Sequence, residues 1–359
     1  MPEFNFSTQT ALPPYPYQPL FNAKSISMTI NILRSILILL VIQIHVSPFT
    51  DRYPDLQHAI LGFIIPVFLF LTGFLFNVRK TMGQYLQYLV KFIVPYVLLE
   101  TAFVCLSAFL PVRDGIQELT LRNVLHHVLL APLGPYWYLH TMIICGTIYF
   151  LSEKLCNYYS KGFTFSLTIL ISICLSYFTD IIGTPATLAY FAGVAARRMN
   201  WNIEDSFTPS FFAIPILIAT ICYGVWADTA FASQTSIYCI LAGATFISGI
   251  RWTTEKLTEK TKEILAFIGA NTLPIYLLHP IFTMLSKKLF SSLLIKDETT
   301  CLFSLITLAL SVAGSLTLIA LSDKLHLTFL LGQKKMLRKQ VTIISNHNNI
   351  NINTLNHLQ

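Results

Sequence analysis

The sequence predicts an all-α polytopic membrane protein with about ten transmembrane helices and both termini in the cytoplasm. Hydrophobic residues make up 54% of its 359 residues and charged residues only 11%, whereas soluble globular proteins carry roughly 25% charged residues. The mean hydropathy is +0.62, and apolar runs close to the ~20 residues that span a bilayer recur along the chain. The net charge of +7 indicates no nucleic-acid partner, because the cations lie in short loops between these runs, where they determine topology.

Ten apolar runs are long enough, or nearly so, to form transmembrane helices. The fifth and sixth are separated only by Thr179-Asp180-Ile181, so a tight turn must join them. The sixth run is short and is either a complete span or a re-entrant segment. The predicted spans are 27–47, 58–77, 86–110, 135–152, 163–179, 182–196, 208–226, 233–250, 264–286 and 302–323.

The distribution of lysine and arginine predicts the orientation. With the N-terminus inside, 17 of the 24 cations lie on the cytoplasmic side, six lie outside, and Arg34 lies within the first span. Cytoplasmic loops of membrane proteins carry this excess of positive charge. We therefore expect one membrane domain over residues 27–325, preceded by a cytoplasmic tail at 1–26. Residues 326–359, basic and then Asn-rich, should form a disordered cytoplasmic tail without chemistry of its own.

The first span carries the two ionisable residues on which the functional hypothesis depends. Arg34 lies near its start and His45 near its end. Their separation is close to three helical turns, which places both on one face about 16 Å apart. Ionisable side chains inside a membrane helix usually line a cavity or a reaction path. An alternative fits the pair equally well: the Arg34 side chain extends to one headgroup layer, and His45 only lies at the other end of the span.

The second and third spans add polar groups. Thr72-Gly73, on a helix that also contains Pro66, either allows close helix packing or borders a polar cavity. On the third span, Lys91 lies at the cytoplasmic edge and Glu100 lies about 14 Å deeper by helical rise. A buried carboxyl group must be neutral or paired. Glu100 is therefore either a structural partner of Arg34 or a site residue, and we favour the structural role.

Two aromatic segments contain histidines. Before the fourth span, Trp137 and His140 lie in a run of aromatic residues typical of an outer membrane interface. The ninth span combines prolines with Tyr276 and His279. By the predicted topology, His45 and His279 both lie in the outer half of the bilayer, so we expect them to face one cavity.

Several kinds of site are excluded. The sequence contains no Walker loop, dinucleotide fingerprint, zinc-protease motif or nucleophile elbow. No Cys-x-x-Cys or Cys/His pair has ligand spacing, so we expect no metal site and no disulfide framework. The seven cysteines lie in or at the ends of apolar runs, at 105, 145, 156, 174, 222, 239 and 301. An enzyme built on this chain would depend on intramembrane histidine and arginine.

With these segments in order, the chain resembles the membrane-bound acyltransferase 3 family, which O-acylates surface and envelope glycans. The resemblance covers about residues 25–325 and is to the short, stand-alone members. Arg34 and His45 reproduce the family signature of arginine, ten residues and histidine. The other matching segments, in family order, are PVFLFLTGFLF, Lys91 with VPY, YWYLH and NTLPIYLLH. The sequence departs from the family pattern at Asn31 for aspartate, Thr72 for serine, and Gln87 and Lys91 for an arginine pair.

The resemblance implies transfer of an acyl group, usually acetyl from cytoplasmic acetyl-CoA, to a glycan hydroxyl at a bacterial inner membrane. We hypothesise that His45 is the general base, since a neutral imidazole can accept the hydroxyl proton during attack. Arg34 would contact CoA or stabilise the thioester end. The resemblance further implies that Thr72 and Tyr276 line the pocket and that Trp137 and His279 shape the acceptor face. Arg79, Lys80 and Lys91 either form a basic mouth for CoA phosphates or serve only as topology charges. Glu100 belongs to the substrate site if it is not structural.

Two other functions fit the sequence. A transporter of small solutes or lipid-linked sugars also uses ionisable residues and broken helices near the midplane, although the hydropathy shows no inverted repeat. A non-catalytic polysaccharide export partner with the same fold would not need His45. Apart from membrane lipids, the expected partner is an envelope glycan, lipopolysaccharide among them, or a lipid-linked sugar. The sequence leaves open the acceptor hydroxyl, the acyl group and the oligomeric state.

Overall fold

The computed structural model describes residues 28–109, 115–156, 160–179, 181–227, 237–290 and 299–338. This part of the chain is built of helices and contains no β-strand, as the sequence predicts. The predicted tail at 1–26 and the Asn-rich residues 339–359 lie outside the described residues. The helices are α1 Met28–Ile44, α2 Ser47–Arg52, α3 Pro54–Leu75, α4 Met82–Ser107, α5 Leu121–Leu129, η1 Gly134–Tyr136, α6 Trp137–Leu155, α7 Lys161–Phe178, α8 Thr184–Arg198, α9 Ile203–Ser206, α10 Ala213–Ala227, α11 Ile237–Lys256, α12 Glu259–Ala270, α13 Thr272–Leu289, α14 Thr300–Lys324 and η4 Leu327–Leu331.

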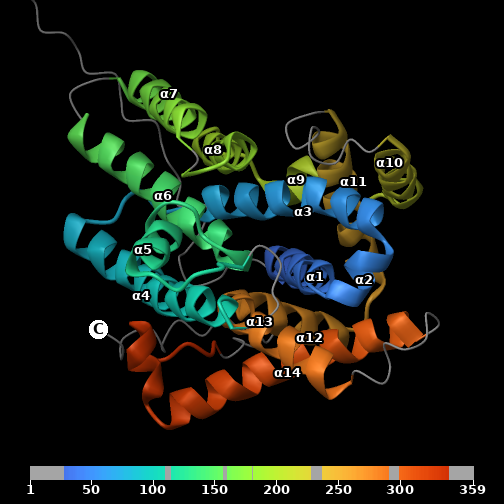
Figure 1. Cartoon of the computed structure of the whole chain (residues 1–359). Coiled ribbons are helices and arrows are strands. Elements are labelled where there is room, and N and C mark those ends of the chain that lie inside the picture. The colour runs from blue at the N-terminus through green and yellow to red at the C-terminus, as the bar shows by residue number, and fades with distance from the viewer. Residues whose placement is uncertain are drawn as a thin grey trace, which may run out of the picture.

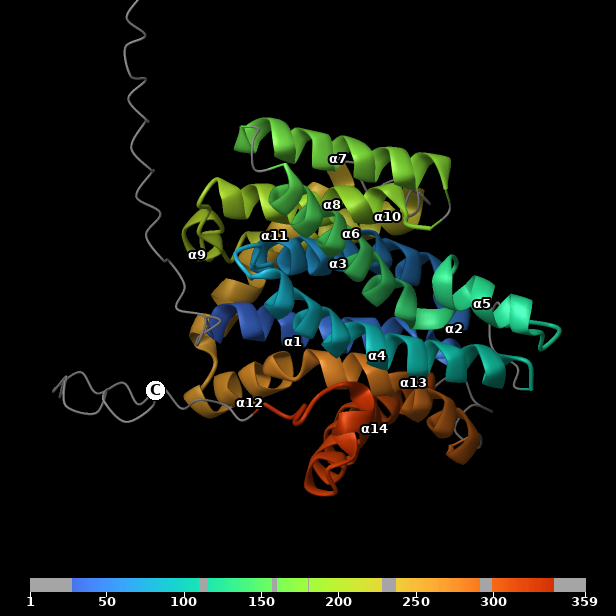
Figure 2. The same cartoon turned by 90° about the vertical axis from the view of Figure 1, so that its left-hand side faces the viewer.

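The helices are stacked around α1 and α3. Figure 2 shows α7 and α8 on one side of the molecule and α12, α13 and α14 on the other, with α1 and α3 between them. The most extensive helix contacts are α3 against α8 and α1 against α12. Leu33, Leu37 and Ile42 of α1 are fully buried. The helix that carries Arg34 therefore lies at the centre of the fold, as Figure 1 also shows.

Two glycines allow these central helices to approach their neighbours. A Cβ atom at Gly193 of α8 would lie 1.9 Å from the carbonyl oxygen of Phe70 in α3. A Cβ atom at Gly269 of α12 would lie 1.7 Å from the carbonyl oxygen of Asn31 in α1. Only glycine fits at such distances, and small residues are the usual means by which membrane helices bring their backbones together.

A sharp turn follows α1. Pro48 lies in the first turn of α2 and Pro54 begins α3, where a proline removes no intrahelical hydrogen bond. Nε2 of Gln57 donates to the carbonyl oxygen of Ile44 at 3.2 Å, which fastens the start of α3 to the end of α1. The turn keeps His45 at the junction of α1, α2 and α3.

The ninth predicted span, 264–286, is not one straight helix. It divides at Asn271 into α12 and α13, whose axes are bent by 79°. The sequence shows prolines in this span, but hydropathy carries no signal for the place of a backbone break. The physical cause is local: Nδ2 of Asn271 donates to the carbonyl oxygen of Phe267 at 2.9 Å, and the ring of Pro274 would clash with the carbonyl group of Ala270 in a continuous helix.

The segment after α14 folds back onto the helices. Both oxygens of the Asp323 carboxylate accept backbone hydrogen bonds, from Met336 at 2.9 Å and from Leu337 at 2.8 Å. Met336 is only 4% exposed. Residues up to Arg338 are thus packed against the membrane domain, although the sequence analysis assigned them to a tail without a role.

The described helices support a multi-pass membrane protein. Five of them are long and apolar enough to cross a bilayer, and the bent pair α12–α13 adds a sixth if it forms one span. Helices α1 and α10 are apolar but shorter. The count of ten spans and the cytoplasmic placement of the termini stay predictions.

Candidate active site

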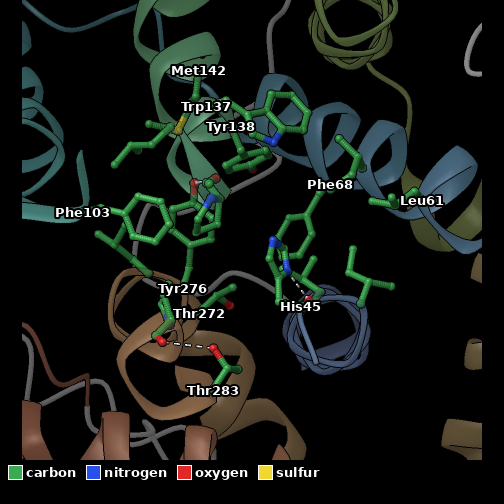
Figure 3. A pocket seen from close by; sticks show the side chains of 18 of the residues that line it. His45, Leu61, Phe68, Phe103, Trp137, Tyr138, Met142, Thr272, Tyr276 and Thr283 are labelled. Carbon is green, nitrogen blue, oxygen red and sulfur yellow. Dashed lines mark hydrogen bonds between the residues drawn. The ribbon is translucent and has the colours of Figure 1, made fainter. Parts of the chain in front are cut away.

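A large cavity lies between the central helices. Its volume is about 1280 Å³, and its walls come from α1, α2, α3, α4, η1, α6 and α13, together with Arg338. Figure 3 shows His45, Phe68, Tyr138 and Tyr276 facing one another across it. Small-molecule sites usually occupy about 300–1,000 Å³, so this cavity has room for more than one substrate.

The cavity is elongated. Its lining follows α1 from Arg34 to His45 and α13 from Thr272 to Lys288, which correspond to about 16 Å and about 24 Å of helical rise. Beyond His45 the lining continues onto α2 at Asp51. The cavity thus has one end near Arg34 and another near α2, and its length approaches the ~30 Å of a hydrocarbon core.

His45 lies in the cavity wall with a defined tautomer. Its Nδ1 lies 2.6 Å from the carbonyl oxygen of Val41. A carbonyl oxygen only accepts, so Nδ1 carries the proton in the neutral ring and Nε2 keeps its lone pair. Figure 3 shows this second nitrogen pointing into the pocket. The ring is therefore arranged to accept a proton from a molecule in the cavity.

His279 supports His45 from behind. The two rings meet edge to face, with centroids 5.2 Å apart. His279 is fully buried, its Nδ1 donates to the carbonyl oxygen of Tyr276 at 2.7 Å, and it does not line the cavity. The structure therefore places His279 next to His45 and outside the cavity wall, and its predicted role at the acceptor face stays a prediction.

Arg34, Thr72 and Tyr138 form a second polar group. The Thr72 hydroxyl donates to the carbonyl oxygen of Phe68 at 2.9 Å, so the Tyr138 hydroxyl is the donor in their 2.5 Å contact. The charge of Arg34 interacts electrostatically with the Tyr138 hydroxyl and with Arg338. Arg34, Thr72, Tyr138 and Arg338 all line the cavity. Arg34 and Thr72 were predicted; Tyr138 was missed, although it follows Trp137 in the same aromatic segment.

Tyrosines fasten α13 to the turn before α6. The Tyr276 hydroxyl donates to the carbonyl oxygen of Pro135, and the Tyr136 hydroxyl donates to that of Leu277 at 2.9 Å. Tyr276 and Trp137 both line the cavity; the resemblance implied a pocket position for Tyr276 and a position at the acceptor face for Trp137. The reciprocal pair of hydrogen bonds determines how far α13 lies from α6, and hence the width of the cavity between them.

Glu100 belongs to neither group. Its Oε1 accepts a hydrogen bond from the backbone N–H of Leu133 at 2.6 Å. The carboxyl group is fully buried, makes no ion pair with Arg34 and does not line the cavity. The expected pairing with Arg34 is therefore corrected: Glu100 instead holds the loop before η1 against α4. Its predicted role in the substrate site stays a prediction.

The predicted basic mouth lies beside the cavity rather than in its wall. Arg79, Lys80 and Lys91 are not lining residues. The ammonium of Lys80 lies 4.4 Å from the centroid of the Tyr88 ring, however, and Tyr88 does line the cavity. Burial and repulsion from Lys91 lower the pKa of Lys80 below its ordinary value, so two of the three cations lie close together next to the cavity.

Within the described part of the chain, no group of three or more histidine, cysteine, aspartate or glutamate side chains is arranged to hold a metal ion.

A family model described as an acyltransferase domain, of the acyltransferase 3 type, matches residues 29–320. Comparison with curated proteins and with solved structures gave no match.

Proposed function

The chain belongs to the acyltransferase 3 family, and on this premise we propose that it is a membrane O-acyltransferase acting on the cell envelope. In this proposal it moves an acyl group, in the simplest case acetyl, from cytoplasmic acyl-CoA to a hydroxyl of an envelope glycan or lipid-linked sugar. The membrane is the bacterial inner membrane. Family membership supports acyl transfer; the donor and acceptor are those that the family resemblance implies, and the length and polar lining of the cavity support both.

The observation that carries the proposal is the unprotonated Nε2 of His45 facing the cavity. A sugar hydroxyl is a poor nucleophile at neutral pH, and a base within hydrogen-bond reach removes its proton during attack. The hydroxyl oxygen bonds to the thioester carbonyl carbon while Nε2 takes the proton. The carbon–sulfur bond then breaks, and the proton passes from the imidazolium to the departing thiolate. His45 returns to its neutral form.

Arg34 would bind a part of the donor that lies far from the reacting carbon. It is about 16 Å of helical rise from His45, which is farther than one arginine side chain spans. We therefore assign Arg34 to binding of the donor rather than to the thioester carbonyl. A donor that lies along α1 would have its thioester at His45 and its distant part at Arg34.

The other end of the cavity suits a hydrophilic acceptor. Beyond His45 the lining contains the polar side chains Ser47, Thr50 and Asp51 of α2 and the paired Lys287 and Lys288 of α13. Hydroxyl, carboxylate and ammonium groups are the partners that sugar hydroxyls and anionic sugars use. This end would face the outer side in the predicted topology.

Transport is a second candidate, because a cavity as long as α13 beside the broken pair α12–α13 is also a feature of transporter sites. The two functions differ in their need for a base. A transporter moves its substrate unchanged, so its cells gain no acyl group and lose none when His45 is replaced.

The test is the acyl content of surface glycans, measured by mass spectrometry. Cells that lack the protein are complemented with wild type, His45→Ala or His126→Ala; His126 is an exposed histidine on α5 outside the cavity. We expect an acyl mass shift with wild type and His126→Ala and none with His45→Ala, at equal abundance in the membrane. A shift restored equally by all three would refute His45 as the base and favour a non-catalytic export partner. No shift in any strain would favour transport.

A further inference from the structure

The C-terminal segment Gly332–Arg338 is fastened to the helices by side chains far away in the sequence. Asp323 accepts from the backbone of Met336 and Leu337. Asn271, at the break between α12 and α13, forms two hydrogen bonds with the backbone of Arg338. Its Oδ1 accepts from the N–H of Arg338 at 2.8 Å, and its Nδ2 donates to the carbonyl oxygen of Arg338 at 3.1 Å. These bonds fix the place of the Arg338 backbone.

From this place the Arg338 side chain lines the cavity beside Arg34. Both residues are lining residues, and the two positive charges interact. Among the described lining residues Asp51 is the one carboxylate, and it lies on α2, beyond His45 and away from Arg34. Two guanidinium groups at one end of a cavity repel each other unless an anion lies between them.

Further cations surround the same end. Nε2 of Gln333 donates to the carbonyl oxygen of Lys91 at 3.4 Å, so the segment lies against α4 at Lys91. Lys91 in turn acts electrostatically on Lys80, whose ammonium lies over Tyr88 in the cavity wall. The local charge favours a ligand with more than one negative charge.

We propose that Arg338 and Arg34 together bind a phosphate-bearing part of the acyl donor, so that the C-terminal segment forms part of the donor site. The inference rests on the proposed function, and it adds a binding residue outside the matched acyltransferase domain. Guanidinium groups suit this task because they form two parallel charge-assisted hydrogen bonds with phosphate oxygens. In acyl-CoA the pantetheine arm separates the phosphates from the thioester, which matches a reacting end at His45 and a phosphate end at the arginines.

The test compares three probes on the purified full-length protein: acetyl-CoA, acetyl-pantetheine, which has no phosphate, and inorganic pyrophosphate. The variants are Arg338→Ala, Arg338→Lys and the control Lys335→Ala. Lys335 is exposed, lies on the same segment and does not line the cavity. Equilibrium binding is measured for each pair, with the melting temperature of every variant recorded.

We expect Arg338→Ala to weaken binding of acetyl-CoA and pyrophosphate by about tenfold or more and to change binding of acetyl-pantetheine less than about twofold. Arg338→Lys should fall between, and Lys335→Ala should match wild type. Equal losses for acetyl-CoA and acetyl-pantetheine would overturn the inference, because Arg338 would then only maintain the fold. Unchanged acetyl-CoA binding by Arg338→Ala would also overturn it while leaving the proposed function standing. If wild type bound pyrophosphate through Arg338 but did not bind acetyl-CoA, the anion site would stand and the proposed function would fail.

Discussion

The imidazole rings of His45 and His279 meet edge to face with their centroids 5.2 Å apart, yet only His45 lines the cavity. His279 is oriented by the hydrogen bond from its Nδ1 to the carbonyl oxygen of Tyr276, and Tyr276 is fastened to Pro135. A chain of contacts therefore runs from the turn before α6 through α13 to the catalytic base proposed here. In the proposed mechanism, His279 would position the ring of His45.

Replacement of His279 by alanine should lower kcat about tenfold and leave KM for acetyl-CoA within about twofold. Loss of the ring leaves a void next to His45, so the base can shift. A displacement of about 1 Å is enough to lower the rate of the chemical step substantially. Steady-state kinetics with the acceptor found by mass spectrometry would separate the two constants. A rise in KM without a fall in kcat would instead assign His279 to substrate binding.

The sequence predicts most of this arrangement, and its failures have physical causes. The order of motifs identified the family correctly. Helical spacing placed Arg34 and His45 on one face of a helix, and the family resemblance singled out Thr72, Trp137 and Tyr276. All five residues line the cavity. Periodicity does not show where a helix bends or which distant segments pack together. The break at Asn271 depends on a side-chain hydrogen bond and on Pro274, which hydropathy does not register.

Arg338 was missed for a related reason. In the sequence, a basic residue after the last apolar run looks like one of the cytoplasmic charges that determine membrane topology. Its position in the cavity depends on Asp323 and Asn271, and the second of these is 67 residues away along the chain. His279 and Glu100 show the converse: both looked functional because polar groups in membrane helices usually are, but neither lines the cavity, and one polar atom of each side chain is bonded to the backbone.

The hydroxyls of Thr72 and Tyr138 should act as a unit. Tyr138→Phe removes the donor in their 2.5 Å contact, and Thr72→Val removes the acceptor. We expect each single variant to lower kcat/KM for acetyl-CoA about fivefold to tenfold, and the double variant to lose little more, with a coupling energy of about 1 kcal/mol. Thr72→Ser should keep most of the activity, because serine retains the hydroxyl. Losses that simply multiply in the double variant would show that the two hydroxyls act independently.

Glu100 should tolerate glutamine but not alanine. Glutamine keeps Oε1 as the acceptor for the N–H of Leu133, whereas alanine leaves that buried donor unpaired, at a cost of about 1–3 kcal/mol. Thermal unfolding of the purified protein should therefore place Glu100→Gln close to wild type and Glu100→Ala well below it. An ion pair with Arg34 would give another result: both variants would then be damaged, and Arg34→Gln would lower the melting temperature to a similar extent.

The contact between Gly269 and α1 predicts a large difference between two glycine-to-alanine changes. At Gly269 the new Cβ would lie 1.7 Å from the carbonyl oxygen of Asn31, so α12 and α1 must separate, and we expect a loss of at least about 3 kcal/mol in folding free energy. Gly162, in the first turn of α7, has no atom within 4 Å of the same position. Alanine there should be neutral or stabilise the protein by about 0.5–1 kcal/mol, because it restricts the unfolded chain and favours the helix. Both variants add one methyl group within a helix, so the difference between their melting temperatures, and between their yields from membranes, reports packing. Since Asn31 lies one turn before Arg34 on α1, any Gly269→Ala protein that does fold should also bind acetyl-CoA more weakly than wild type. A Gly269→Ala protein as stable as Gly162→Ala would contradict the close packing of α1 against α12, and with it the position of Arg34 in the cavity.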